Sequence, residues 1–176
     1  MKKLLTVVAL AFAAISVNAQ DYNTYVGGGV RFQSTSDETL FAIQPEIGYK
    51  LTDTFSLGIA VGFGTSGSGS SKYTEFLIQP YVRHSLLKIG GNVNFFLDYQ
   101  LGYKNSGLKD NKTNTFEIGA APGLAWNVNP RLSVVTHLGF IGYQSSKLDV
   151  EGSKAVNKFT VEAITQNLGL SVYYNF

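Results

Sequence analysis

The sequence has no cysteine among its 176 residues, which excludes disulfides, thiolate metal sites and a lipid-modified N-terminal cysteine. It has only two histidines, His84 and His137, and their positions do not match the ligand spacing of a metal site. Its formal net charge is only +2, without the basic stripe that nucleic-acid binding requires. We therefore expect no metal, no cofactor and no nucleic-acid partner.

Long apolar runs are also absent, apart from one between Leu4 and Ile15. This run is shorter than the roughly 20 residues that a membrane-spanning helix needs, which argues against a helical membrane protein. It follows Lys2 and Lys3 and precedes an Ala-x-Ala-like site ending at Ala19, the order found in secretory signal peptides. We expect residues 1–19 to be removed. The remaining 157 residues (176 − 19) then form one domain, residues 20–176, with a formal charge of zero.

What the sequence does contain is a period-two alternation of apolar and small or polar residues, which is typical of β-strands. It is clearest between Phe41 and Leu51, and it resumes from Phe55 to Phe63 after a short turn. The same pattern recurs at residues 75–83, 93–102, 116–126 and 132–140. With a first strand near 22–33 and a last near 159–176, the count is eight.

The predicted connections alternate in length. Short turns lie near 52–54, 87–92 and 127–131, and longer polar segments near 34–38, 65–72, 104–114 and 144–158. This pattern predicts an all-β fold, an eight-stranded antiparallel up-and-down β-barrel with both termini at the short-turn end. A shift of 77 residues places Pro45 on Pro122 and Phe63 on Phe140, which supports the register of the hairpins.

The apolar faces of these strands carry too many large side chains to fit inside the barrel, because eight strands enclose only a narrow interior. They are therefore predicted to face lipid, which argues against a soluble, lipocalin-like carrier. Aromatic residues near the strand ends predict two interfacial girdles. The lower girdle contains Tyr49, Phe55 and Trp126 with the C-terminal Tyr174 and Phe176, and the upper girdle contains Phe41, Phe63, Phe116 and Phe140.

The C-terminal segment Gly169-Leu170-Ser171-Val172-Tyr173-Tyr174-Asn175-Phe176 ends in an aromatic-x-aromatic pattern. In this segment and in its strand pattern, the mature chain resembles the small outer-membrane β-barrel family of Gram-negative bacteria, often called porin-like. The resemblance implies a location in the outer membrane, contact with its lipid and a monomeric barrel. It also implies that Tyr174 and Phe176 form the signal read by the barrel-assembly machinery, although Ser171 stands where that signal usually has glycine.

The face predicted to line the interior carries four charges of each sign. They are Arg31, Lys50, Arg83 and Lys104 with Glu46, Glu75, Asp98 and Glu117. Buried charges must be paired or hydrated, so this set predicts a plug of ion pairs. The alternative is a polar, gated pathway.

Three functions remain open. A structural or surface-interaction barrel is favoured, and a narrow transport or solute-binding channel is the alternative. A lipid-modifying enzyme is disfavoured, because Ser133 lies roughly 13 Å from His137 along the strand.

Three prolines, Pro45, Pro80 and Pro122, fall on the apolar faces of the second, fourth and sixth predicted strands. Proline has no N–H to donate, and a closed barrel has no free edge on which to place it. We therefore predict a bulge or a locally widened strand pairing beside each proline.

Overall fold

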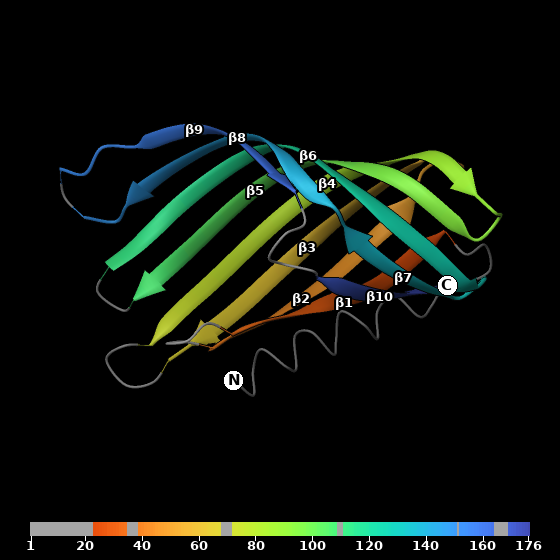
Figure 1. Cartoon of the computed structure of the whole chain (residues 1–176), viewed down its shortest axis with the longest axis horizontal. Helices are drawn as coiled ribbons and strands as arrows, with labels where there is room; N and C mark the ends of the chain where they lie inside the picture. The colour runs from red at the N-terminus through yellow and green to blue at the C-terminus, as the bar shows by residue number, and fades with distance from the viewer. Residues whose placement is uncertain (1–22, 35–38, 68–71, 109–110, 151, 164–168) are drawn as a thin grey trace.

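The computed structural model describes residues 23–34, 39–67, 72–108, 111–150, 152–163 and 169–176. They form one antiparallel sheet of ten strand segments (Figure 1). The segments are β1 (Thr24–Ser34), β2 (Thr39–Lys50), β3 (Phe55–Ser66), β4 (Tyr73–Ile89), β5 (Val93–Leu108), β6 (Asn111–Asn129), β7 (Leu132–His137), β8 (Gly139–Leu148), β9 (Val156–Ala163) and β10 (Leu170–Asn175). No helix in the described ranges is long and apolar enough to cross a membrane. The predicted signal peptide, residues 1–19, lies outside these ranges.

The sheet closes into a barrel because β1 pairs with β2 on one side and with β10 on the other. β7 and β8 both pair with β6 and are separated only by Leu138, so together they make the seventh barrel strand. β10 pairs with β7 and β9 pairs with β8, so these two make the eighth. The predicted eight-stranded antiparallel barrel is confirmed.

The short connections and the C-terminus lie at one end of the barrel (Figure 1). At the other end, the prediction of a polar loop over 104–114 was wrong. β5 continues to Leu108 and β6 begins at Asn111, with Asn105 paired to Asn114. The apolar alternation ends where the polar part of the hairpin begins, although backbone pairing continues, so alternation alone underestimates strand length. At the short-turn end, β4 extends to Ile89 into the predicted turn over 87–92, because a register shift between Ser85 and Leu87 interrupts the alternation while pairing with β5 continues.

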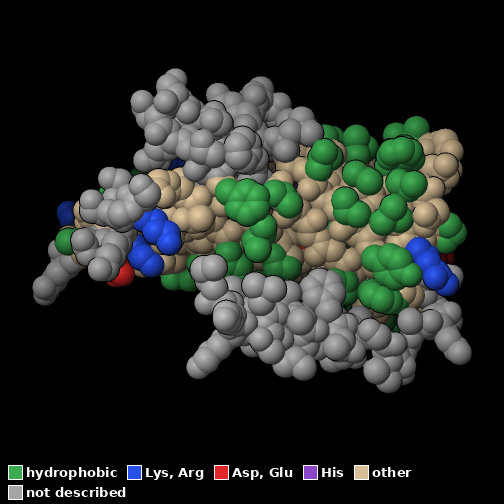
Figure 2. Space-filling model, turned by 90° about the horizontal axis from the view of Figure 1, so that it is seen from below, with side chains coloured by type: hydrophobic (Ala, Val, Ile, Leu, Met, Phe, Trp, Pro, Cys, Tyr) green, Lys and Arg blue, Asp and Glu red, His purple; other side chains and the backbone are tan. Residues whose placement is uncertain are grey.

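The outer wall is apolar. Hydrophobic side chains cover much of the described surface seen in Figure 2, and lysine and arginine side chains appear toward its two ends. The exposed large side chains include Leu57, Leu101, Ile118 and Val172, all from the predicted apolar rows. Exposure of this surface to water would be strongly unfavourable, since removing each Å² of apolar surface from water contributes about 25 cal/mol of stabilisation.

The bulge predicted beside each proline is present at Pro122, whereas beside Pro45 and Pro80 the pairing is interrupted without a change of register. Pro45 is missing from the ladder of paired residues between β2 and β3, although the register is the same on both sides of the gap. Pro80 is likewise missing from the ladder between β4 and β5. At Pro122 the register changes by one residue between the β7 and β8 pairings, which is a β-bulge. There the Leu138 N–H donates to the Pro122 carbonyl at 2.7 Å.

This bulge overturns one predicted girdle position, Phe140. One extra residue reverses the faces of all that follow, so Phe140 is buried and its neighbour Ile141 is exposed. Gly139 permits the bulge with a φ of 155°, and a side chain there would meet the Glu162 carbonyl. The 77-residue repeat therefore fails at its last position, since Phe63 stays in the outer row of β3 and packs on Phe76.

Candidate functional site in the barrel interior

Four aromatic side chains lie against the wall in the lower part of the interior. This aromatic layer consists of Tyr25 of β1, Tyr81 of β4, Phe96 of β5 and Tyr173 of β10, each no more than 5% exposed. Each ring lies over a glycine of a neighbouring strand, where a methyl group would overlap the ring. The glycines are Gly48, Gly58, Gly123 and Gly27 respectively. The missing glycine side chains thus provide the space that the rings fill.

Arg83 is enclosed by this layer. Its guanidinium carbon lies 4.0 Å from the Phe96 ring centre and 5.2 to 5.9 Å from the centres of the three tyrosine rings. Its Nε and Nη2 donate to the two carboxylate oxygens of Asp98, both at 2.8 Å. Glu46 lies 3.8 Å from Nη2. A buried guanidinium needs this combination of paired carboxylates and ring faces to offset its lost hydration.

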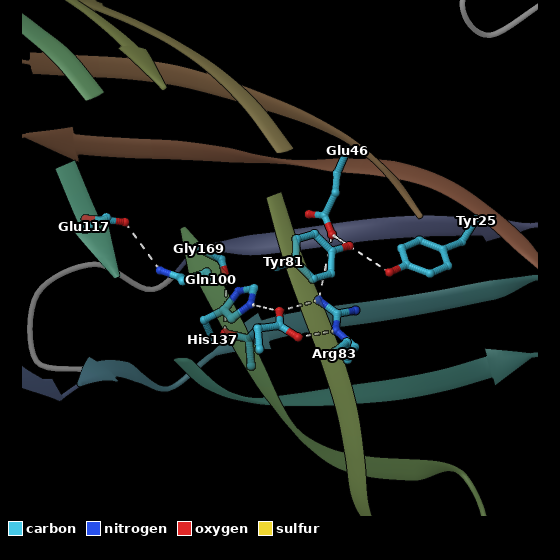
Figure 3. Close-up of polar contacts among 10 residues, drawn as sticks. Tyr25, Glu46, Tyr81, Arg83, Gln100, Glu117, His137 and Gly169 are labelled. Atoms are coloured by element: carbon cyan, nitrogen blue, oxygen red, sulfur yellow. Dashed lines mark hydrogen bonds and ion pairs between the residues drawn. The ribbon is translucent and has the colours of Figure 1, made fainter. Parts of the chain in front are cut away.

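Hydrogen bonds link these groups into one network (Figure 3). The Tyr81 hydroxyl donates to Glu46 and lies 2.7 Å from the Tyr25 hydroxyl. On the other side, His137 Nε2 lies 2.8 Å from the second Asp98 oxygen. We call Tyr25, Glu46, Tyr81, Arg83, Asp98 and His137 the Arg83 cluster. Apart from His137, whose side chain is 38% exposed, the residues of the cluster are buried.

A polar cavity of about 390 Å³ lies on the loop side of the Arg83 cluster. Glu75, Lys104 and Glu117 line it, each half-buried. Glu117 accepts hydrogen bonds from the side-chain amides of Gln100 (3.4 Å) and Gln144 (3.2 Å). The cavity is thus lined by carboxylates, amides and one lysine in its deeper part.

The eight interior charges named from the sequence therefore occupy different places. Glu46, Arg83 and Asp98 meet in the Arg83 cluster, and Glu75, Lys104 and Glu117 line the cavity. Lys50 ends β2 at the short-turn end and does not line the cavity. The backbone of Arg31 belongs to β1, but its side chain lies outside the described part of the structure.

Sequence reasoning missed two features of this interior. The first is the aromatic layer. Its signal in the sequence was a large aromatic residue among the small residues of an inward-facing row, with a glycine at the facing position of the neighbouring strand. The second is the pair Lys158 and Glu162 of β9, which are exposed and line the cavity. Lys158 was assigned to a loop, because the polar start of β9 has no apolar alternation.

Comparison with solved structures decides what kind of barrel this is. The crystal structure of the outer membrane protein OprG from Pseudomonas aeruginosa matches with a TM-score of 0.55 and 7% identity, over 90% of this chain and 98% of that one. Neisserial surface protein A (NspA) matches with a TM-score of 0.51 and 16% identity, over 87% and 96%. The fold is that of a small outer-membrane β-barrel. No model of a protein family matches the sequence, and no curated protein is significantly similar to it.

Within this outer-membrane barrel fold, most predicted girdle residues lie on the outer surface. Tyr49, Phe55 and Trp126 are exposed near the short-turn end, and Phe41 and Phe116 near the loop end. Phe55 also stacks on His84, with ring centres 4.3 Å apart. At the C-terminus, Tyr174 and Phe176 pack edge to face at 5.0 Å.

The histidine and serine considered for catalysis belong to separate networks of the barrel. His137 is bonded to Asp98, whereas Ser133 donates to Asn127 at 2.9 Å and accepts from Asn175 at 3.2 Å. Among the described residues, no group of three or more histidine, aspartate or glutamate side chains is arranged to hold a metal ion.

Proposed function

We propose that the protein spans the outer membrane as a non-enzymatic barrel with a structural or surface-interaction role, and that the Arg83 cluster plugs its lumen. The apolar outer wall, the aromatic residues at both of its ends and the similarity in fold to outer-membrane proteins support the location. The polar strand extensions at the loop end, such as the hairpin of β5 and β6, support a role at the cell surface.

The enclosure of Arg83 is the observation that carries the proposal. A water-filled path would require Arg83 to leave Asp98, Glu46 and the aromatic rings around it. Breaking such a buried ion pair costs about 3–5 kcal/mol, because the remaining charge is left without a partner. An eight-stranded barrel also has little interior space besides its side chains. We therefore expect the resting barrel to be closed to ions.

A non-enzymatic role rests on the separation of the candidate groups. A hydrolase needs a nucleophile within hydrogen-bond reach of its base. Here the described contact of His137 Nε2 is with Asp98, and Ser133 is engaged by two asparagines.

Planar-bilayer recording of the refolded mature protein tests the plug. We expect no unitary conductance, and a double variant R83A/Y81A, which removes the centre of the Arg83 cluster, should conduct. Steady conductance by the unmodified protein would instead establish the narrow channel. Membrane fractionation tests the location separately, since recovery of the protein in a soluble fraction would contradict an outer-membrane role.

A further inference from the structure

The cavity above the Arg83 cluster is a candidate binding chamber. Tyr81, Asp98 and His137 line it on the side of the Arg83 cluster, and two exposed residues of β9, Lys158 and Glu162, also line it. Its volume of about 390 Å³ falls in the range of roughly 300–1,000 Å³ that is usual for small-molecule sites. Because Lys158 and Glu162 are exposed to solvent, a solute can reach the chamber from outside.

Among the described side chains around this chamber, negative charge exceeds positive charge. The described lining carries the five carboxylates of Glu46, Glu75, Asp98, Glu117 and Glu162. Three positive side chains oppose them, namely Lys104 and Lys158 in the lining and Arg83 beneath it. With His137 counted as neutral, the balance among the described side chains is two negative charges (5 − 3), and a narrow chamber with low-dielectric walls concentrates their field. The chamber therefore favours a cation.

Glu117 is the carboxylate best placed to receive that cation. Its two described hydrogen bonds come from the neutral amides of Gln100 and Gln144, which orient the carboxylate without neutralising it. Within the described ranges, no ion pair involves Glu117. A half-buried carboxylate forms its strongest hydrogen bond with a donor that also carries positive charge.

An aromatic ring lies next to this carboxylate. The bulge at Leu138 turns Phe140 inward, where its ring lies against Gly119 of β6 and Gly142 of β8. These glycines are one inward position from Glu117 on β6 and from Gln144 on β8, a distance of roughly 7 Å along a strand. A side chain at either glycine would overlap the ring. The bulge and both glycines thus place a ring beside an unneutralised carboxylate.

We propose that this chamber binds a small organic cation, with its ammonium group between the Glu117 carboxylate and the Phe140 ring. The carboxylate supplies charge and a hydrogen-bond acceptor, and the ring supplies its negative face. Gln100 and Gln144 act as positioning residues, because they hold the carboxylate toward the chamber.

Titration calorimetry on the refolded mature barrel in zwitterionic detergent tests the proposal, with putrescine and tetramethylammonium as probes. We expect saturable binding of both amines and none of acetate. E117Q keeps the size of the side chain and removes its charge, so it should weaken binding at least about tenfold. F140L keeps an apolar side chain and removes the ring, so it should weaken tetramethylammonium binding about threefold. D149N, in the exposed connection after β8, is the matched loss of a carboxylate outside the chamber and should leave both affinities unchanged.

Three outcomes would overturn the proposal. They are the absence of saturable amine binding, equal affinity in E117Q and the unmodified protein, and binding of acetate as tight as that of the amines. Heat-modifiable migration on gels shows whether each variant has refolded. If E117Q does not refold, F140L decides alone, and unchanged tetramethylammonium affinity in that variant overturns the site.

Discussion

Tyr81 lies directly across the strand pair from Gly58, and its ring covers that glycine. The relationship allows a large ring to lie flat against the inner wall instead of projecting across the lumen. Tyr25 over Gly48 repeats it on the neighbouring strand pair, where Gly48 is itself paired with Gly58, and the hydroxyls of the two tyrosines meet at 2.7 Å. A narrow barrel can therefore enclose both the rings and the guanidinium of Arg83.

G58A should destabilise the barrel by about 1–3 kcal/mol, because the added methyl group overlaps the Tyr81 ring and forces it out of place. G169A is the matched control, since a methyl group at Gly169 meets no atom within 4 Å. The measurement is the free energy of unfolding from reversible urea titration in lipid vesicles. Equal midpoints for the two variants would show that the contact does not constrain the ring.

Y81F and Y173F should differ although both remove one buried hydroxyl. The Tyr81 hydroxyl bonds to Glu46 and Tyr25, so its loss should cost about 1–3 kcal/mol. Among the described residues, the buried Tyr173 hydroxyl has no hydrogen-bond partner, so its removal should be nearly neutral. The same urea titration distinguishes them, and a larger loss in Y173F would contradict the network described for the Arg83 cluster.

R83A should destabilise the barrel by about 3–5 kcal/mol, because it leaves Asp98 and Glu46 buried without their cation. R131A, in the exposed turn between β6 and β7, should cost less than about 1 kcal/mol. If the two variants shift the urea midpoint equally, the charges around Arg83 do not act as a buried set.

Single cysteines test the bulge, because the natural sequence contains none. In refolded protein, F140C should react with a small water-soluble maleimide through the cavity. I141C, which lies on the outer wall, should be shielded by detergent and react more slowly. The opposite order of labelling rates would mean that Leu138 does not reverse the strand faces.

Deletion of Phe176 should reduce the yield of membrane-inserted barrel in cells far more than F159A. Both side chains are aromatic, and Phe159 is 70% exposed on β9. The difference follows if the terminal aromatic is read by the assembly machinery, as the resemblance of the C-terminal segment implies. The yield is measured as heat-modifiable protein in outer-membrane fractions. Equal yields would mean that Phe176 is not part of the assembly signal.

Much of the barrel could be predicted because strand geometry is local. Successive side chains point to opposite faces, so alternation identifies both the strands and their outward rows without knowledge of neighbouring strands. The contact between Arg83 and Asp98 was accessible in the same way, because the two residues face each other across the hairpin of β4 and β5. The lack of an N–H group on proline is also a local property, and it indicated where pairing between strands would be interrupted.

The interior site depended on information that alternation does not contain. Glu46 reaches Arg83 and His137 reaches Asp98 from strands that are not sequence neighbours, so their meeting depends on barrel closure and strand register. The orientation of Phe140 depended on one extra residue opposite Pro122, which reverses the strand faces while the sequence keeps its apolar spacing. The sequence by itself thus determined the class of fold and the lipid-facing rows, because these follow from the two-residue period of a strand. Only the tertiary structure decided which charges meet and which ring enters the cavity, because those contacts cross the lumen and a shift of one residue changes them.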